Sequence, residues 1–189
     1  MVFWNELGSP RLHVGIDYNV DPRIHAFDDY CATQDVHPHW GVDQADAQAI
    51  SHILDIYGSP PLSLVIDDAS HKLASTISSF DILFPHLAPG GLYVIEDWAW
   101  SYDAEFLAAN PKWRHHPELA SIIPRLHSML AEHPDYIEQI VSTPDFLVAR
   151  RGPGQLTPRL GDVHSRTWER DARRRRRTAG FRHRLRRGR

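Results

Sequence analysis

Apolar residues recur in two alternating patterns along the first 150 residues of the chain. Short apolar runs bounded by turn residues are typical of buried strands, whereas longer segments with an apolar residue at every third or fourth position are typical of helices. The short runs predict strands at residues 12–17, 40–43, 62–66 and 92–95. The longer segments predict helices at residues 46–57, 72–87 and 117–133. Strands that alternate with helices in this way predict an α/β fold with a mostly parallel, doubly wound sheet.

Proline and glycine mark the boundaries of several of these elements. Pro89-Gly90-Gly91 predicts a sharp turn before a strand, and Pro124 should break or kink the helix at 117–133. After that helix, residues 136–141 and 146–150 flank a short polar turn. We therefore expect these two segments to form an antiparallel pair at the C-terminal side of the sheet.

Each of the four predicted strands ends in acidic residues. Ligands of parallel sheets bind at the edge where the carboxyl ends of the strands meet. Carboxylates gathered at one edge repel each other unless a cation or a hydroxyl-rich ligand is bound among them. The acids are Asp17, Asp43, Asp67-Asp68 and Glu96-Asp97. This pattern indicates a ligand site at that edge of the sheet.

Asp68, Glu96 and Asp97 are the candidate metal ligands. Carboxylate oxygens suit a hard divalent cation such as Mg²⁺, which retains waters that a substrate can displace. His71 follows Asp68 by three residues, at the start of the next predicted helix, from where its imidazole could accept the proton of a hydroxyl held at the cation. The alternative is structural: the carboxylates would be surface charges, or Asp68 or Ser70 would cap the helix.

Asp17, Asp43 and Gln44 are the candidate residues for binding a nucleoside cofactor. A carboxylate after a strand can accept hydrogen bonds from both hydroxyls of a ribose, which suits Asp17. Asp43 and Gln44 offer hydrogen-bonding groups for an adenine edge. The alternatives are a turn at Asp17 and a capping role for Asp43-Gln44 at the helix that starts near Asp46.

Three aromatic residues, Trp98, Trp100 and Tyr102, directly follow the Glu96-Asp97 pair. Aromatic faces pack well on sugar rings and on other ring substrates, so these side chains could form the wall of a pocket for an acceptor molecule. The alternative is that they belong to the core. Both interpretations stay open on the sequence alone.

Charge divides the chain into two parts. Residues 166–189 carry 12 Arg against two acidic residues, a net charge of +10, whereas the rest of the chain has a net charge of −13. Residues 1–152 are therefore predicted to form the folded domain and residues 153–189 an Arg-rich, disordered tail. A basic run can bind nucleic acid. The favoured interpretation is instead an extension that docks on the acidic body of the chain.

Cys31 is the only cysteine, so the chain cannot form an intramolecular disulfide. This composition suits a cytoplasmic protein, because reducing conditions keep thiols free there. No apolar run approaches the roughly 18 residues that a membrane-spanning helix needs. We therefore expect a cytoplasmic protein without a membrane partner.

Two segments of the chain resemble a known family. They are V-I-D-D-A-S-H at residues 65–71 and F-P-H-L-A-P-G-G-L-Y-V-I-E-D at residues 84–97. Both look like the corresponding segments of the metal-dependent sugar O-methyltransferases of macrolide biosynthesis, of the mycinamicin type. Residues 15–17 and 41–46 resemble that family's second strand and its G-D-Q-S-D segment. The resemblance covers about residues 1–150, and Ala69 stands where the family has glycine.

The resemblance implies a class I methyltransferase with a Rossmann-like sheet that uses S-adenosylmethionine and Mg²⁺. It also implies that Asp68, Glu96 and Asp97 hold the metal and that His71 is the catalytic base. The family's first strand and its glycine-rich loop should precede Phe3-Trp4, so we expect the chain to lack them and to be truncated at its N-terminal end. Such a loop lets the backbone approach the methionine part of the cofactor.

The predicted function is therefore methylation of a hydroxyl of a sugar or of another small natural-product acceptor in antibiotic biosynthesis, dependent on S-adenosylmethionine and assisted by Mg²⁺. Two alternatives stay open. The chain could be an inactive methyltransferase fragment that does not bind the cofactor, or a binding protein whose basic tail contacts nucleic acid. The sequence is also compatible with a homo-oligomer.

Overall fold

The computed structural model describes residues 11–20, 25–155 and 157–163. The strands of this part are β1 (His13–Asp17), β2 (Val36–Trp40), β3 (Leu62–Asp67), β4 (Leu87–Glu96), β5 (Ile137–Ser142) and β6 (Phe146–Arg151). The α-helices are α2 (His25–Gln34), α3 (Ala47–Ile56), α4 (Leu73–Leu83), α5 (Ala104–Ala109) and α6 (Ile122–Glu132). The 3-10 helices are η1 (Phe84–His86), η2 (Trp100–Tyr102), η3 (Pro111–His115) and η4 (Leu119–Ser121). No helix of the described part is long and apolar enough to cross a membrane.

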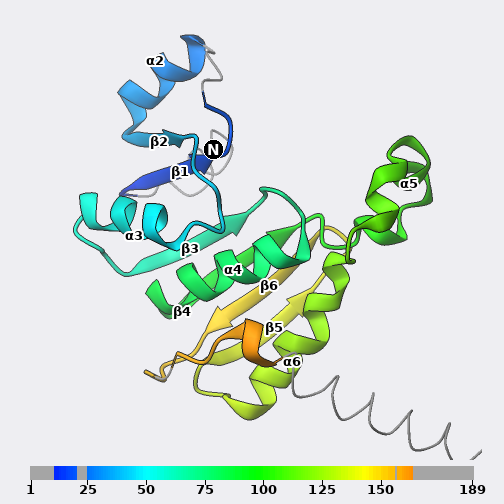
Figure 1. The fold of residues 1–189 in the computed structure, drawn as a ribbon. Helices are drawn as coiled ribbons and strands as arrows, with labels where there is room; N and C mark the ends of the chain where they lie inside the picture. Colours follow the sequence, from blue (N-terminus) through cyan, green and yellow to red (C-terminus); the bar gives the residue numbers. More distant parts are fainter. Residues whose placement is uncertain (1–10, 21–24, 156, 164–189) are drawn as a thin grey trace, which may run out of the picture.

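The strands form two sheets (Figure 1). The larger sheet has the order β3-β4-β6-β5, in which β3 and β4 are parallel and β6 is antiparallel to both of its neighbours. β1 and β2 form a separate parallel pair. Parallel strands joined through helices, followed by an antiparallel hairpin, confirm the α/β fold and the C-terminal antiparallel pair that the sequence predicts.

β2 lies earlier in the chain than predicted. The sequence pattern places a strand at residues 40–43, but the observed strand ends at Trp40. Two histidines and Pro38 interrupt the apolar pattern of β2, so the strand does not appear as an apolar run in the sequence. Among the described residues β2 pairs with β1 alone, and Pro38 is tolerated in such a strand because an edge without a partner needs no N–H donors. The pattern also misses α2, whose apolar residues form only a weak stripe.

Pro124 does not break its helix. It is the third residue of α6, in the first turn, where a missing N–H leaves no hydrogen bond unmade. The helix predicted at residues 72–87 is shorter than expected, because α4 ends at Leu83 and Pro85 lies in η1, which follows directly.

The Pro89-Gly90-Gly91 segment lies inside β4 rather than before it. It forms a bulge, because the pairing with β3 moves from Leu62 opposite Leu87 to Leu64 opposite Leu92. Glycine is required at position 91, since a Cβ there would lie only 2.9 Å from the carbonyl oxygen of Ala88. After the bulge the two strands stay in register as far as Asp67 and Ile95. The bulge therefore fixes how the carboxyl ends of β3 and β4 meet.

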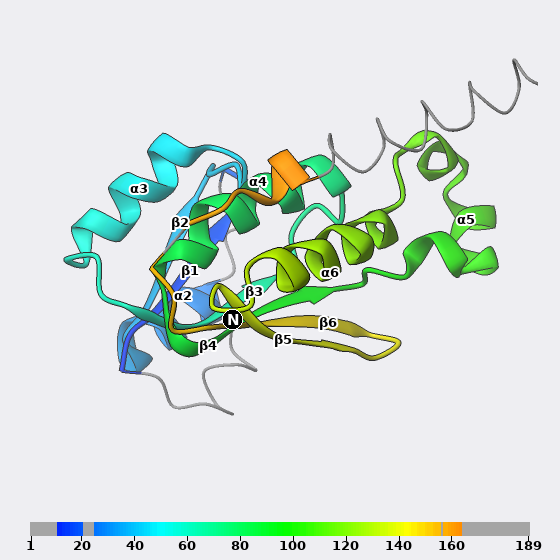
Figure 2. The ribbon, with the colours of Figure 1, turned by 90° about the horizontal axis from the view of Figure 1, so that it is seen from below.

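Helices α4 and α6 cover one face of the larger sheet (Figure 2), and the core lies between these layers. The rings of Phe80 and Phe84 stack with centroids 4.4 Å apart, and Tyr93 and Tyr136 pack against them. All four side chains are buried. Each such burial contributes about 1.5–3 kcal/mol. This packing holds β3 and β4, whose ends carry the acidic residues.

β1 and β3 each have one hydrogen-bonded neighbour within the described part of the chain. Leu64, in the middle of β3, is 42% exposed, which is unusual for an apolar residue of a parallel strand. The β1–β2 pair is joined to the larger sheet near its carboxyl edge, where the side chain of Gln44 hydrogen-bonds to Asp67, the last residue of β3, and to Ser70 beyond it. The expected lack of the family's first strand and glycine-rich loop stays a prediction.

The chain continues across the core after β6. Leu160 is fully buried in the main hydrophobic cluster, and the carboxylate of Asp81 on α4 accepts hydrogen bonds from the backbone N–H groups of Leu160 and Gly161. The domain boundary predicted after residue 152 stays a prediction, but the segment that follows it contributes to the core. Residues 164–189, which contain most of the predicted Arg-rich tail, lie outside the described residues.

Leu160→Ala is expected to lower the free energy of unfolding by about 2–5 kcal/mol, because it leaves a cavity beside α4. The matched control is Leu64→Ala, at a much more exposed position, and should cost clearly less. Equilibrium unfolding in urea measures both losses. Equal losses for the two variants would mean that the segment around Leu160 does not pack on the core in solution.

Candidate active site

The acidic residues after β3 and β4 lie side by side at the carboxyl edge of the larger sheet. Asp67 pairs with Ile95 in the parallel register, so Asp68 and Glu96 follow at neighbouring positions. Asp97 comes directly after the end of β4. The two strand ends, 28 residues apart along the chain as counted from Asp68 to Glu96, therefore bring their acids to one place.

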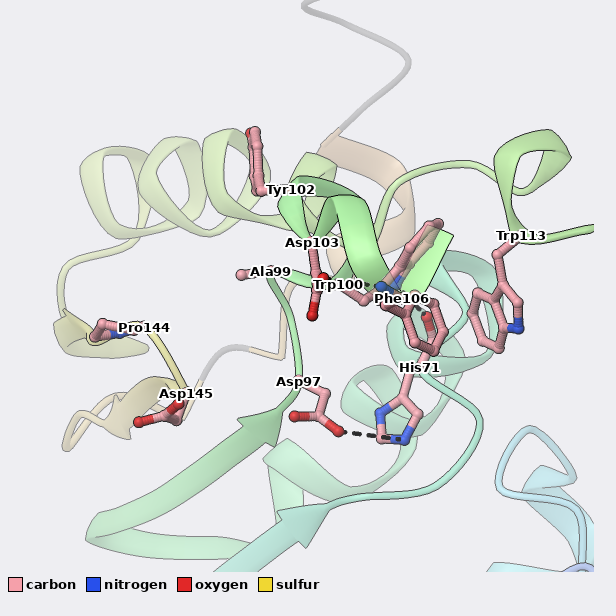
Figure 3. Close-up of a pocket in the computed structure, with 10 residues that line it drawn as sticks. All are labelled: His71, Asp97, Ala99, Trp100, Tyr102, Asp103, Phe106, Trp113, Pro144 and Asp145. Atoms are coloured by element: carbon pink, nitrogen blue, oxygen red, sulfur yellow. Dashed lines mark hydrogen bonds and ion pairs between the residues drawn. The ribbon is translucent and has the colours of Figure 1, made fainter. Parts of the chain in front are cut away.

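His71 lies between two of these acids. Its Nε2 atom is 3.8 Å from Oδ1 of Asp68 and 4.0 Å from Oδ2 of Asp97 (Figure 3 shows His71 and Asp97). These separations are too long for hydrogen bonds. The side chains of Asp68 and Asp97 are mostly exposed, at 59% and 70%, whereas that of His71 is 24% exposed.

Asp68, His71 and Asp97 fit a hard divalent cation. Each offers one oxygen or nitrogen atom, and these atoms lie within 4.8 Å of one another. Water can reach the exposed carboxylates, as a partly hydrated ion such as Mg²⁺ requires. The imidazole belongs to the same group of atoms, so the geometry allows His71 to be a ligand as well as a base.

The charges of Asp68, His71 and Asp97 affect the pKa of Glu96. Partial burial raises its pKa above the usual range, and the negative charges of Asp68 and Asp97 raise it further, while His71 opposes the shift. Negative charges that raise the pKa of a neighbouring carboxyl group favour binding of a cation among them. Glu96 is thus a neighbour of Asp68 and Asp97, but the group of ligand atoms within 4.8 Å of one another contains His71 and not Glu96. The metal-binding roles of Asp68, Glu96 and Asp97 remain a proposal.

The backbone at this site adopts a conformation that side-chain-bearing residues rarely use. His71 and Asp97 both have a φ of +51°. Residues held in the left-handed region cost about 1–3 kcal/mol and cluster at functional sites. Contacts from elsewhere hold both residues: Trp100 Nε1 donates to the carbonyl oxygen of His71 at 3.0 Å, and the N–H of Asp97 donates to the carbonyl oxygen of Asp145 at 3.2 Å.

Asp67 is buried directly beneath the exposed acids. Its carboxylate accepts hydrogen bonds from the side-chain amide of Gln44, at 3.0 and 3.2 Å, and from the hydroxyl of Tyr93 at 3.0 Å. Burial raises the pKa of Asp67, and the hydrogen bonds from Tyr93 and Gln44 oppose this shift. Its oxygens are thus held by protein donors, which agrees with the omission of Asp67 from the predicted ligands.

Asp17 and Asp43 lie after the neighbouring strands β1 and β2, which the backbone joins at their ends through the N–H of Val42 and the carbonyl oxygen of Asp17. Asp17 Oδ1 accepts hydrogen bonds from the backbone and side-chain N–H groups of Asn19, both at 2.8 Å. Asp43 Oδ1 accepts one from the N–H of Ala45. The contacts of Asp17 are the turn considered as its alternative, whereas Asp43 makes a local turn contact and Asp46 takes the capping role considered for Asp43. The cofactor-binding role of Asp17 and Asp43 remains a prediction.

Gln44 differs from its neighbour Asp43 because its side chain is buried. The amide group donates to Asp67, and the amide oxygen accepts a hydrogen bond from the N–H of Ser70 at 2.9 Å. Asp46, and not Gln44, caps α3 by accepting from two backbone N–H groups. Its predicted contact with an adenine edge stays untested, but both functional groups of the Gln44 side chain already have partners within the chain.

A cavity of about 440 Å³ opens beside His71 and Asp97 (Figure 3). Of the three aromatic residues predicted to wall an acceptor pocket, Trp100 and Tyr102 line it. Trp98 is not part of the lining, and its Nε1 donates to the carbonyl oxygen of Thr143. Trp100 is also part of the buried core, so both interpretations of this residue hold.

Part of the lining is not predicted from the sequence. The remaining residues around the cavity are Ala99, Asp103, Phe106, Trp113, Pro144 and Asp145. Phe106 and Trp113 pack on Trp100, with centroid distances of 6.3 and 4.9 Å. The concentration of aromatic residues between positions 98 and 113 was the available signal, but α5 and η3, which carry Phe106 and Trp113, have no clear periodicity.

The comparisons with known proteins agree with these motifs. No protein-family model matches the chain. The chain is 45% identical over 67 residues to 8-demethyl-8-alpha-L-rhamnosyl tetracenomycin-C 2'-O-methyltransferase of Streptomyces olivaceus, which covers 35% of this chain and 17% of that protein. It is 54% identical over 55 residues to mycinamicin VI 2''-O-methyltransferase of Micromonospora griseorubida, covering 29% of this chain and 13% of that protein.

The fold is similar to that of a solved methyltransferase. The structure of MycE from the mycinamycin biosynthetic pathway, in complex with Mg, SAH and mycinamycin VI, matches with a TM-score of 0.53 at 21% identity. The match covers 80% of this chain and 48% of that one. The chain thus spans about half the length of the solved structure and a smaller share of the curated relatives. Over this part, the predicted resemblance is confirmed: the chain is similar in sequence to macrolide sugar O-methyltransferases of the mycinamicin type, and its Rossmann-like fold is similar to that of MycE.

Proposed function

We propose that the chain acts in S-adenosylmethionine-dependent, Mg²⁺-assisted methylation of a hydroxyl of a sugar or of another small natural product. The observation that carries this proposal is that Asp68, Asp97 and His71 bring their ligand atoms together and that two of them, His71 and Asp97, also line an aromatic cavity. Methylation of a cyclic alcohol can use all three parts of this site. The carboxylates can hold a cation, the imidazole can accept the proton of the hydroxyl, and the aromatic wall can pack on the ring.

The chemistry of the methyl transfer assigns a role to each residue. When bound, Mg²⁺ would be held by Asp68, Glu96 and Asp97 and would supply positive charge that makes a nearby hydroxyl more acidic. Nε2 of His71 accepts the proton of the acceptor hydroxyl. The acceptor oxygen forms a bond to the methyl carbon of S-adenosylmethionine while the carbon–sulfur bond breaks, which leaves neutral S-adenosylhomocysteine. Asp68 and Asp97 flank the imidazole, with carboxylate oxygens 3.8 and 4.0 Å from Nε2 of His71.

The lining of the cavity supports a sugar or another polyhydroxylated ring as the acceptor. Phe106 and Trp113 offer apolar ring faces, and Asp103 and Asp145 offer carboxylates that can accept hydrogen bonds from hydroxyls. The names of the two curated relatives describe methylation at the 2' and 2'' positions, which fits such an acceptor.

Binding of the methyl donor is proposed for Asp17 and Asp43. The sequence predicts the same role for Gln44, but both functional groups of its side chain already have partners within the chain. The alternative, an inactive methyltransferase fragment, differs from the proposal in one measurable property. Calorimetric titration with S-adenosylmethionine should detect binding if these residues suffice. Absence of binding at millimolar cofactor would favour the inactive fragment. The cytoplasmic location, a homo-oligomer and contact of the Arg-rich tail with nucleic acid remain predictions.

Transfer of a labelled methyl group tests the proposed function. The full chain is incubated with methyl-labelled S-adenosylmethionine, Mg²⁺ and glycosylated macrolides or tetracenomycins that carry free sugar hydroxyls. We expect labelled product in the presence of Mg²⁺ and its loss on addition of a chelator, with recovery when Mg²⁺ is restored. Product formation that is indifferent to the chelator would contradict the proposed metal role.

A further inference from the structure

We infer that Gln44 is a positioning residue, which clamps the loop at residues 68–71 from the neighbouring strand–helix unit and so presents Asp68 and His71 in their active geometry. The inference rests on the proposed function, because it assigns this loop to the metal and base chemistry. It concerns a contact that joins residues 26 positions apart in the sequence.

The contacts of Gln44 have the form of a clamp. The residue is 7% exposed, although it lies in a connection between a strand and a helix, where a polar side chain normally faces water. Its Nε2 donates to both carboxylate oxygens of Asp67, and its Oε1 accepts from the backbone N–H of Ser70. One amide thus holds the residues on both sides of Asp68.

The carboxylate of Asp67, to which Gln44 donates, is itself held in place by buried residues. Its Oδ2 also accepts a hydrogen bond from the hydroxyl of Tyr93 at 3.0 Å, and this hydroxyl lies 2.8 Å from that of Ser79 on α4. Tyr93 is fully buried in the core. A buried, fully hydrogen-bonded network of this kind has one low-energy arrangement, so it specifies the position of the carboxylate.

The loop needs such support, because its conformation is costly. His71 has a φ of +51°, and no side chain of α4 caps the start of that helix. The peptide units around His71 are held from two sides. Gln44 binds the N–H of Ser70, and Trp100 binds the carbonyl oxygen of His71. Loss of the Gln44 contact should let the loop relax, which moves Asp68 and His71 relative to Asp97.

A pair of variants tests the clamp by breaking and restoring it. Gln44→Glu places a second carboxylate against buried Asp67. The double variant Gln44→Glu/Asp67→Asn exchanges amide and acid, so that the amide at position 67 can donate to the carboxylate at position 44, which can still accept from the N–H of Ser70. The matched control is Gln48→Glu, which makes the same change at an exposed position on α3. Binding of Mn²⁺, followed by electron paramagnetic resonance, reports on the loop. Circular dichroism melting identifies any variant that fails to fold.

We expect Gln44→Glu to weaken Mn²⁺ binding by about tenfold or more, the size of effect that follows the loss of groups that orient metal ligands. The double variant should recover most of the affinity, and Gln48→Glu should change it little. An affinity unchanged in Gln44→Glu, or a loss that the double variant does not restore, would overturn the inference.

A second readout does not depend on the metal. Gln44→Met removes the acceptor for the N–H of Ser70 at similar volume, so hydrogen exchange of the Ser70 amide in the full chain should become about fivefold faster, and Gln48→Met should leave it unchanged. If the wild-type chain binds no Mn²⁺, the proposed metal role fails, and the Ser70 exchange alone decides on the clamp. Unchanged exchange in Gln44→Met would overturn the inference.

Discussion

His71→Asn is expected to lower kcat for methyl transfer by about 10²–10⁴-fold, the usual contribution of a positioned general base. Asn tolerates the left-handed backbone that His71 adopts, so this variant removes the imidazole while preserving the loop. Its side-chain amide cannot accept a proton at neutral pH. The rate of labelled methyl transfer at saturating acceptor and Mg²⁺ measures the effect.

The control for this variant is His52→Asn, which changes an exposed histidine on α3 away from the site. It should leave the rate unchanged. If His71→Asn retains the wild-type rate while binding Mg²⁺ normally, His71 is not the base. If the variant loses Mg²⁺ affinity instead, the imidazole is a metal ligand, which the grouping of His71 with Asp68 and Asp97 also allows.

Mg²⁺ is expected to stabilise the folded chain, and Asp97→Asn is expected to remove this stabilisation. A ligand that binds only the folded state contributes about 2.7 kcal/mol at a concentration 100 times its Kd. Asn again suits the left-handed backbone, because Asp97 has a φ of +51°. Thermal unfolding with and without Mg²⁺ measures the difference. The control, Glu138→Gln, removes an exposed acid of β5 and should keep the Mg²⁺ effect.

The stability of the metal-free chain should depend on pH through the raised pKa of Glu96. Burial and the charges of Asp68 and Asp97 raise the pKa of Glu96, so the folded chain binds more protons than the unfolded chain between the usual and the raised pKa. Without metal, the contribution of Glu96 to stability therefore falls as pH rises through this window.

For the Asp97→Asn variant, a stabilisation by Mg²⁺ that survives the substitution would contradict the proposed ligand set.

The parts of the fold that local sequence specifies were predictable. Residues 62–66 and 92–95 are short apolar runs followed by acids, and each pattern needs only neighbouring residues to be recognised. The sequence misplaces β2 because Pro38 and two histidines interrupt its apolar pattern. Pro38 is compatible with a strand that has one neighbour within the described residues. Leu160 was assigned to a tail, since no local pattern shows that it returns to the core.

The site also has features that local sequence specifies and features that depend on contacts between distant residues. Its acids and His71 lie in two contiguous motifs, so the sequence alone brought them together at the strand ends. The roles of Gln44 and Tyr93 depend on contacts between residues 23 and 26 positions apart, which one sequence does not reveal. Gln44 was interpreted from its neighbours as a cofactor contact, whereas burial and the acceptor at Ser70 N–H give it a structural partner within the chain.

A crystal of the chain grown with Mn²⁺ would test the central claim most directly, because anomalous scattering locates the ion without assumptions about its ligands. The account predicts one ion bound by oxygens of Asp68, Glu96 and Asp97, at about 2.0–2.2 Å as for Mg²⁺, with Nε2 of His71 outside the coordination sphere and facing the aromatic cavity. An ion bound through His71, or no ion at this edge of the sheet, would contradict it.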